Sequence, residues 1–161
     1  MMSAVENEFR IELRRQANYR FEVHFPDTAV PVLLTDEDAP LGENAGPSPG
    51  QLLGVAVANC LAASLTFAMR KFKNEPGALR ATATVRLARN EQKRLRIRHI
   101  GVDLHLPMPA ANVQMLDRIL AQFEDFCIVT QSVRAAIPVD VRVFDGTGAI
   151  LPLPASAGAM G

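Results

Sequence analysis

Residues that commonly build metal sites, disulfide frameworks and nucleic-acid surfaces are scarce in this chain. Its 161 residues include no Trp, one Tyr and two Cys, and 17 acidic side chains balance 17 basic ones. A balanced charge gives no overall field that attracts nucleic acid or an anionic membrane. Two cysteines are too few for a disulfide framework, and they do not form a Cys-x-x-Cys motif. We therefore expect no metal, no nucleic-acid partner and no bound cofactor.

A membrane or secretory signal is also lacking at the N-terminus. Residues 1–10 include Glu6, Glu8 and Arg10 and contain no apolar segment, so we expect a cytoplasmic protein. The uncharged run 52–69 is just long enough to span a membrane. It is rich in Ala, however, and lacks the aromatic residues that flank membrane helices. We favour a buried helix of a globular protein over a membrane span.

That uncharged run forms the centre of the strongest helix signal in the chain. Ser48 suits the N-cap, Pro49 suits the first helical position, and Arg70 and Lys71 suit the last turn. Apolar residues fall all round the helix rather than along one stripe. This distribution predicts burial on most sides.

Alternating polar and apolar residues predict strands before and after the central helix. The resulting order, β-β-β-α-β-β-α-α-β, favours an α+β fold with mostly antiparallel sheets. We expect one domain over residues 1–161, with a core at about 8–147 and a loosely held tail at 152–161. The predicted strands cover 8–13, 20–25, 30–34, 79–89, 94–106 and 137–144, a turn covers 16–19, and the later helices begin near 110–112 and 126.

One chain offers little to cover a helix that is apolar all round. Only one amphipathic helix, with Leu116, Ile119, Leu120 and Phe123 on one face, and a modest sheet are predicted besides it. A second subunit could supply the missing cover, so we favour a homodimer.

The two thiols leave two interpretations open. Free cysteine often packs as a small buried hydrophobe, and Cys60 and Cys127 both lie in apolar helical segments. Alternatively, two thiols within reach of each other can cycle between dithiol and disulfide. Cys127 lies at the predicted N-terminus of a short helix, where the helix dipole would lower its pKa.

The histidines and arginines give weaker signals. His24, His99 and His105 fall in predicted strands and make no ligand spacing on a helix, so neither a zinc site nor a Cys60–histidine dyad is supported. The basic run 86–99 alternates with apolar residues, as the solvated face of a half-buried strand does. No aromatic residue lies within it, which argues against single-strand nucleic-acid binding.

Three segments carry a resemblance to a known family. They are the turn 46–49 followed by Ala58-Asn59-Cys60, the segment 126–133 around Cys127, and the closing strand 137–144. On these segments the chain resembles the OsmC/Ohr family of osmotically inducible and organic-hydroperoxide-resistance proteins. The resemblance covers roughly residues 8–147. It implies an OsmC-like fold and an intertwined homodimer with the central helices buried between two sheets.

The resemblance also implies a thiol peroxidase. Cys60 would be the peroxidatic thiolate and Cys127 the thiol that resolves its sulfenic acid, with an external dithiol as reductant. The family holds the thiolate with an arginine from the N-terminal strands, for which Arg20 and Arg15 are the candidates here. A glutamate directly after the proline orients that arginine in the family. Gly50 stands at this place, and Glu43 is the candidate substitute.

Two functions therefore stay open. The first is a peroxidase that reduces organic hydroperoxides through Cys60 and Cys127. The alternative is an OsmC-like domain without significant peroxidase activity, which binds an apolar small molecule or senses redox state at the dimer interface. Both retained cysteines favour the first function, and Gly50 favours the alternative.

Overall fold

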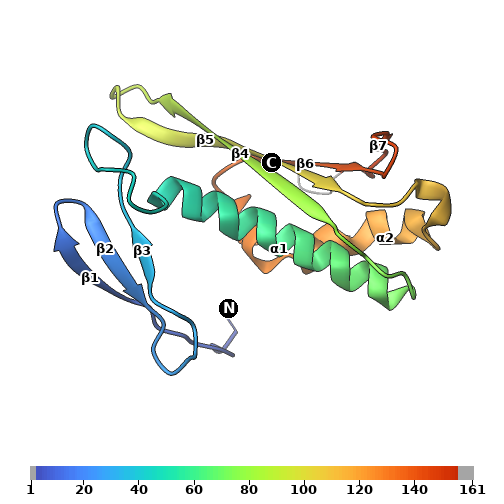
Figure 1. The fold of residues 1–161 in the computed structure, drawn as a ribbon. Helices are drawn as coiled ribbons and strands as arrows, with labels where there is room; N and C mark the ends of the chain where they lie inside the picture. The colour runs from blue at the N-terminus through green and yellow to red at the C-terminus, as the bar shows by residue number, and fades with distance from the viewer. Residues whose placement is uncertain (1–2, 156–161) are drawn as a thin grey trace. The chain divides into compact units, whose positions relative to one another are not determined.

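The computed structural model describes residues 3–155. The chain divides at Leu52 into an N-terminal unit and a C-terminal unit, which are described separately. Helix α1, Pro49–Lys71, begins at the end of the first unit and continues into the second (Figure 1). The predicted α+β class, with mostly antiparallel sheets and a central helix, is confirmed.

The N-terminal unit contains a three-stranded antiparallel sheet in the order β1-β2-β3. Strands β1 (Glu12–Ala17) and β2 (Arg20–His24) form a hairpin. The predicted strand 8–13 and turn 16–19 are wrong in their limits. Asn18 adopts a φ of 48°, which asparagine tolerates, so the chain reverses over residues 18–19 alone. Residues before Glu12 have no partner because β2 ends at His24.

Strand β3 is shorter than the predicted strand 30–34 and lies further along the chain. It covers Leu33–Thr35 and pairs antiparallel with β2. Pro31 explains the late start, because proline lacks the N–H that a strand donates to its neighbour.

The start of α1 forms as the sequence predicts. The backbone N–H of Gln51 donates to the Ser48 hydroxyl at 3.4 Å, and the Ser48 N–H donates to the Gln51 side-chain oxygen at 2.8 Å. This reciprocal pair is a capping box, and Pro49 occupies the first helical position. Arg70 and Lys71 lie in the last turn, where cations complement the helix dipole.

The C-terminal unit is built on a four-stranded sheet in the order β4-β5-β6-β7. Its strands are β4 (Arg80–Arg89), β5 (Leu95–His105), β6 (Val139–Phe144) and β7 (Ile150–Leu151). The pairing of β5 with β6 is parallel, and the other two pairings are antiparallel. The short strand β7 was not predicted. It forms because residues 145–148 turn the chain back onto the end of β6.

Parallel pairing requires a crossover between β5 and β6, and the predicted helical region supplies it. The crossover contains η1 (Ala110–Asn112), α2 (Leu116–Gln122), η2 (Phe123–Phe126) and α3 (Ile128–Val133). The predicted helix start at 110–112 is only a 3₁₀ turn. Met115 then takes a left-handed conformation before α2 begins.

One side of α1 packs against the C-terminal sheet and the crossover, whose residues form one core cluster with it (Figure 1). The predicted burial on most sides is wrong for the single chain. Val55 and Phe67 are 59% and 56% exposed. The buried residues of α1 are Gly54, Val57, Ala58, Leu61, Ser64, Leu65, Ala68 and Met69. The helix passes the length and hydropathy test for a membrane span, but its packing against the sheet makes it a core helix.

The predicted loose tail, 152–161, is described only in part. Leu153 packs against the core cluster. Residues 156–161 lie outside the described residues.

Two glycines of α1 provide a matched test of the packing between helix and sheet. A Cβ at Gly54 would lie 2.8 Å from Val85 Cγ2, whereas a Cβ at Gly50 would meet nothing within 4 Å. We expect Gly54→Ala to destabilise the protein by about 1–3 kcal/mol through overpacking. Gly50→Ala should stabilise it by about 0.4–1 kcal/mol by restricting the unfolded chain. Urea unfolding of both variants measures the change in the free energy of unfolding. Equal stabilisation by both substitutions would contradict the packing of Gly54 against Val85.

Candidate active site

The C-terminal unit brings the two cysteines together. Cys60 lies in the middle of α1, half-buried against the core cluster, and Cys127 lies in the crossover and is fully buried. Both are free thiols, and Cys60 packs against the core cluster that contains Cys127, close enough to raise the pKa of the Cys127 thiol. The structure therefore provides the proximity that the spacing of the two residues in the sequence cannot show.

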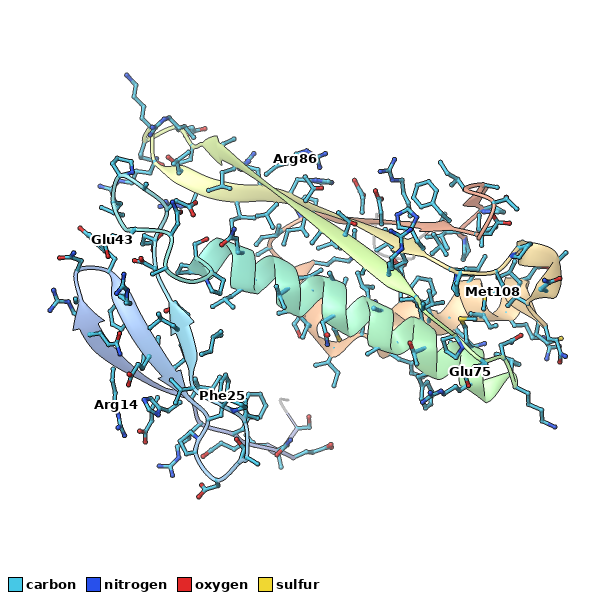
Figure 2. The ribbon with its side chains drawn as sticks, in the orientation of Figure 1. Arg14, Phe25, Glu43, Glu75, Arg86 and Met108 are labelled. Carbon is cyan, nitrogen blue, oxygen red and sulfur yellow. The ribbon has the colours of Figure 1, made fainter. Side chains whose placement is uncertain are left out.

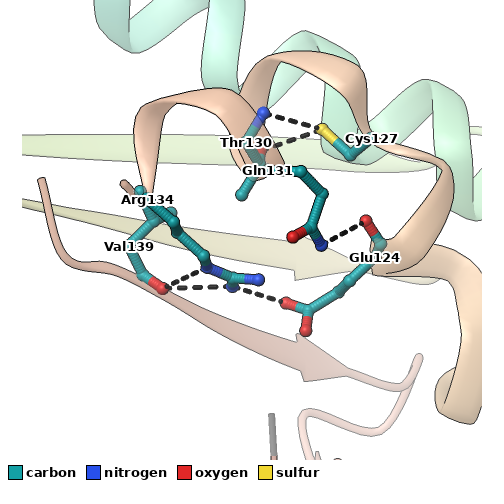
Figure 3. Close-up of polar contacts among 6 residues, drawn as sticks. All are labelled: Glu124, Cys127, Thr130, Gln131, Arg134 and Val139. Atoms are coloured by element: carbon teal, nitrogen blue, oxygen red, sulfur yellow. Dashed lines mark hydrogen bonds and ion pairs between the residues drawn. The ribbon is translucent and has the colours of Figure 1, made fainter. Parts of the chain in front are cut away.

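Cys127 is fixed by its position at the N-cap of α3. The backbone N–H of Thr130 donates to its sulfur at 3.4 Å, and the Thr130 hydroxyl oxygen lies 2.9 Å from the same sulfur (Figure 3). Thr130 is itself fully buried. Its role was missed by sequence reasoning, although a polar residue three positions after an N-cap is a recognisable capping signal.

The predicted lowering of the Cys127 pKa is wrong. Burial raises the pKa of this thiol, and the hydrogen bond to Cys60 raises it further. The contacts from Thr130 act in the opposite direction but do not outweigh desolvation. Cys127 is consequently held as a protonated thiol.

A polar clamp holds the segment around Cys127 in place (Figure 3). Arg134 donates to the Glu124 carboxylate at 3.0 Å and to the Val139 carbonyl oxygen at 3.1 and 3.2 Å. Gln131 donates to the Glu124 carbonyl oxygen at 3.1 Å. These contacts join η2, α3 and the start of β6, so they limit the movement of the Cys127 backbone. Sequence reasoning did not predict this clamp.

The N-terminal unit contains the predicted arginine and its carboxylate partner. Arg20, the first residue of β2, donates to Glu43 at 2.6 Å. Its Nε is buried and has no hydrogen-bond partner within residues 3–155. Arg15, the other candidate, is exposed and donates instead to the carbonyl oxygen of Asn18 in its own turn. Of the two candidates, Arg20 is therefore the arginine that pairs with a carboxylate, that of Glu43.

A buried carboxylate builds the loop that presents Glu43. Asp36, only 3% exposed, accepts backbone N–H bonds from Glu37, Glu43 and Ala45 at 2.9–3.1 Å. These bonds, that from Ala45 foremost, lower the pKa of Asp36. Gly42 is required here, because a Cβ would lie 2.2 Å from the Glu37 carbonyl oxygen. The loop therefore has little freedom to withdraw Glu43 from Arg20.

The histidines do not join the cysteines. His99 and His105 alternate along β5 with the fully buried Ile100 and Leu104, so they point away from the sheet face that packs against α1. This excludes a dyad between Cys60 and either histidine. His24 contacts Glu22 on its own strand. Within residues 3–155 no group of three His, Cys, Asp or Glu side chains could hold a metal ion.

Comparisons with known proteins agree with the observed fold. A family model described as OsmC-like protein matches residues 42–142. No curated protein matches the sequence. An OsmC-like protein of unknown function from Vibrio cholerae has a TM-score of 0.71 at 12% identity, covering 86% of this chain and 99% of its own.

Two further solved structures are similar. An organic hydroperoxide resistance protein OsmC from Legionella pneumophila has a TM-score of 0.65 at 17% identity, covering 87% of this chain and 98% of its own. A putative organic hydroperoxide resistance protein from Vibrio cholerae, with captopril bound in one of its active sites, has a TM-score of 0.63 at 20% identity. That comparison covers 92% of this chain and 99% of the other. At these identities the structures show a shared fold.

The contact between the thiols predicts an intramolecular disulfide. Mild oxidation with diamide should convert both free thiols to one disulfide within each chain, because Cys60 and Cys127 lie close together in the same core cluster. Thiol counting and intact mass under denaturing conditions measure the product. Cys127→Ser should instead form only disulfides between chains, and the same behaviour of the unmodified protein would contradict the contact.

Proposed function

Because the chain belongs to the OsmC-like family, we propose that it is a cytoplasmic thiol-dependent peroxidase that reduces organic hydroperoxides. The observation that carries the proposal is the proximity of Cys60 and Cys127 where α1 packs against the crossover. A peroxidatic cycle needs a second thiol within reach of the first, whereas two cysteines that only fill a core need not meet.

The proposed catalytic cycle begins at Cys60. The Cys60 thiolate attacks the terminal peroxide oxygen, the O–O bond breaks, and the alkoxide takes a proton and leaves as the alcohol. Cys60 is thereby oxidised to a sulfenic acid. Cys127 then forms a disulfide with it and water leaves, carrying the Cys127 proton. An external dithiol reduces the disulfide and is itself oxidised, so the cycle needs no bound cofactor.

Each thiol has an environment suited to its part of this cycle. Cys60 is half-exposed and can be reached by a peroxide, while Cys127 is fully buried behind it. A Cys127 thiol whose pKa is raised stays protonated until Cys60 has reacted, which keeps it from competing for the peroxide. The apolar side chains around Cys60 favour an organic peroxide over hydrogen peroxide.

A buried thiolate also needs a cation, and we assign this role to Arg20. Arg20 keeps donors available, since its Nε has no partner within the described chain and Glu43 occupies only one terminal nitrogen. Glu43 would orient the guanidinium as the glutamate after the proline does in the family. The role proposed for Arg20 thus rests on its ion pair with Glu43 and not only on its being an arginine.

The exposed apolar surface of the C-terminal unit supports an intertwined homodimer. On α1, Val55 and Phe67 are more than half exposed, and Phe126 and Ile128 of the crossover are 46% and 79% exposed. Phe67 and Phe126 pack edge to face with their ring centres 5.5 Å apart, so these two exposed rings form one patch that joins α1 to the crossover. Apolar surface of this kind usually marks an interface, and a second α1 has matching chemistry.

The alternative, an OsmC-like domain that binds an apolar small molecule or senses redox state, is favoured by one observation. Gly50 replaces the glutamate that the family places after the proline. If Glu43 does not substitute for it, Cys60 lacks an oriented cation and turnover is lost while the apolar surroundings remain. Peroxidase assays separate the two functions.

The first test is turnover of cumene hydroperoxide with a dithiol donor. Cys60→Ser should lower kcat/KM by at least about 10³-fold, because it removes the nucleophile. Arg20→Met should lower it by about 10²-fold, because it removes the charge that stabilises the thiolate and the developing alkoxide. Steady-state kinetics under excess dithiol measure both effects.

Arg14→Met is the matched control for Arg20→Met, because Arg14 is an exposed arginine of β1 paired only with Glu12. It should retain full turnover. Absence of turnover in the unmodified protein would refute the peroxidase and favour the ligand-binding alternative. Equal activity of Arg14→Met and Arg20→Met would refute the role assigned to Arg20 and would leave the peroxidase proposal standing.

The second test concerns the dimer. Sedimentation should give twice the mass of one chain, and Phe67→Glu should weaken self-association at least about tenfold by placing a charge in the apolar interface. Ile150→Glu, at a residue 61% exposed on β7, should leave the dimer intact. A monomeric unmodified protein would contradict the proposed assembly.

A further inference from the structure

The sheet face of the C-terminal unit that points away from α1 carries a polar groove. It has a volume of about 280 Å³ and contains Arg86, His99 and Gly101 among its lining residues. Figure 2 shows Arg86 on the outer side of the sheet. None of the groove residues belongs to the thiol site, and the proposed peroxidase does not require them.

The groove is centred on one row of the sheet. Gly101 of β5 lies between Thr84 of β4 and Asp140 of β6 in the strand register. The neighbours of Gly101 in its strand, Ile100 and Val102, are fully buried on the opposite face. Side chains of the adjoining residues therefore surround Gly101, which has no side chain of its own.

Nothing in the packing requires glycine at residue 101. A Cβ there would lie 3.5 Å from Arg86 Nη1 and 3.6 Å from His99 Cε1, which are ordinary contacts, and the backbone has no positive φ. Glycine weakens the interior of a strand and often marks a close approach by a ligand. Here it leaves open the floor directly beneath the Arg86 guanidinium.

A hydrogen-bonded chain holds that guanidinium over the floor. Arg86 Nη1 lies 2.9 Å from His99 Nδ1, and His99 Nε2 lies 2.6 Å from an Asp140 carboxylate oxygen. Arginine has no lone pair to offer, so Nδ1 must accept, and Nε2 carries the proton that is donated to Asp140. Arg86 is therefore held by the His99 ring, without an ion pair to any carboxylate in residues 3–155.

A second guanidinium lines the groove beyond Gly101. Arg142 donates through Nε and Nη2 to both oxygens of Asp103, at 2.7 Å each, and lies over the Phe144 ring. This bidentate pair fixes its orientation and leaves Nη1 uncommitted. The carboxylates of Asp103 and Asp140 also line the groove, but each already accepts a hydrogen bond from a neighbour.

We propose that this groove binds a small oxyanion, the carboxylate or phosphate group of a small metabolite, over Gly101. The guanidinium of Arg86 is its main partner, and Nη1 of Arg142 and the hydroxyl of Thr84 are further donors. An arginine fork matches both kinds of oxyanion. Two lining guanidiniums disfavour a metal cation, and two lining carboxylates with a volume of about 280 Å³ disfavour a nucleic-acid strand.

Amide NMR of the full-length protein tests the proposal. The protein is titrated separately with inorganic phosphate and with acetate, at constant ionic strength set with chloride. Saturable shifts at the amides of Thr84 and Gly101 are expected with at least one anion, and the tighter anion identifies the ligand class. Absence of saturation with both anions overturns the proposal.

Variants distinguish the groove from general ion binding. Arg86→Gln should weaken the saturable binding at least tenfold, and Gly101→Val, whose side chain suits a strand and fills the floor, should abolish it. Arg89→Gln, an exposed arginine of the same strand outside the groove, should leave it unchanged. Equal loss in Arg86→Gln and Arg89→Gln would show only an adventitious ion and would overturn the proposal. None of these outcomes depends on peroxide turnover.

Discussion

The contact between the Cys60 and Cys127 thiols depends on the packing of α1 against the C-terminal sheet. The helix supplies Cys60, and the crossover between β5 and β6 supplies Cys127. Gly54 lets the helix approach β4, since any larger residue would collide with Val85. The chemistry proposed for the site therefore rests on a packing distance.

The ion pair proposed for the site also depends on a series of contacts, all of them within the N-terminal unit. Asp36 gathers three backbone N–H groups, the resulting loop presents Glu43, and Glu43 pairs with Arg20. In the proposed function, this arrangement orients the arginine in a chain that has Gly50 where the family resemblance implies a glutamate. The Glu43 carboxylate carries the same charge as that glutamate and reaches Arg20 from a different position in the chain.

The order of the strands and of α1 up to β6, the capping of α1 and the approximate limits of β4 and β5 could be predicted from the sequence, because these features depend on local patterns. Sequence reasoning misplaced β1, since the hairpin register follows from the left-handed Asn18 rather than from alternation. It predicted a lowered pKa for Cys127 from the helix end alone, whereas burial in a cluster of distant residues raises it. The proximity of Cys127 to Cys60 joins residues far apart in the chain, which no local pattern reports, and the clamp of Glu124 with Arg134 depends on how η2 and α3 fold against each other.

The parallel pairing of β5 with β6 has a consequence for how the two thiols come together. Cys60 lies in α1, before β4, and Cys127 lies in the crossover between β5 and β6, so the thiols meet only through long-range contacts of the folded chain. Such contacts require the closure of a long loop, which slows their formation. In the unfolded chain the two thiols are independent, and each is open to separate oxidation.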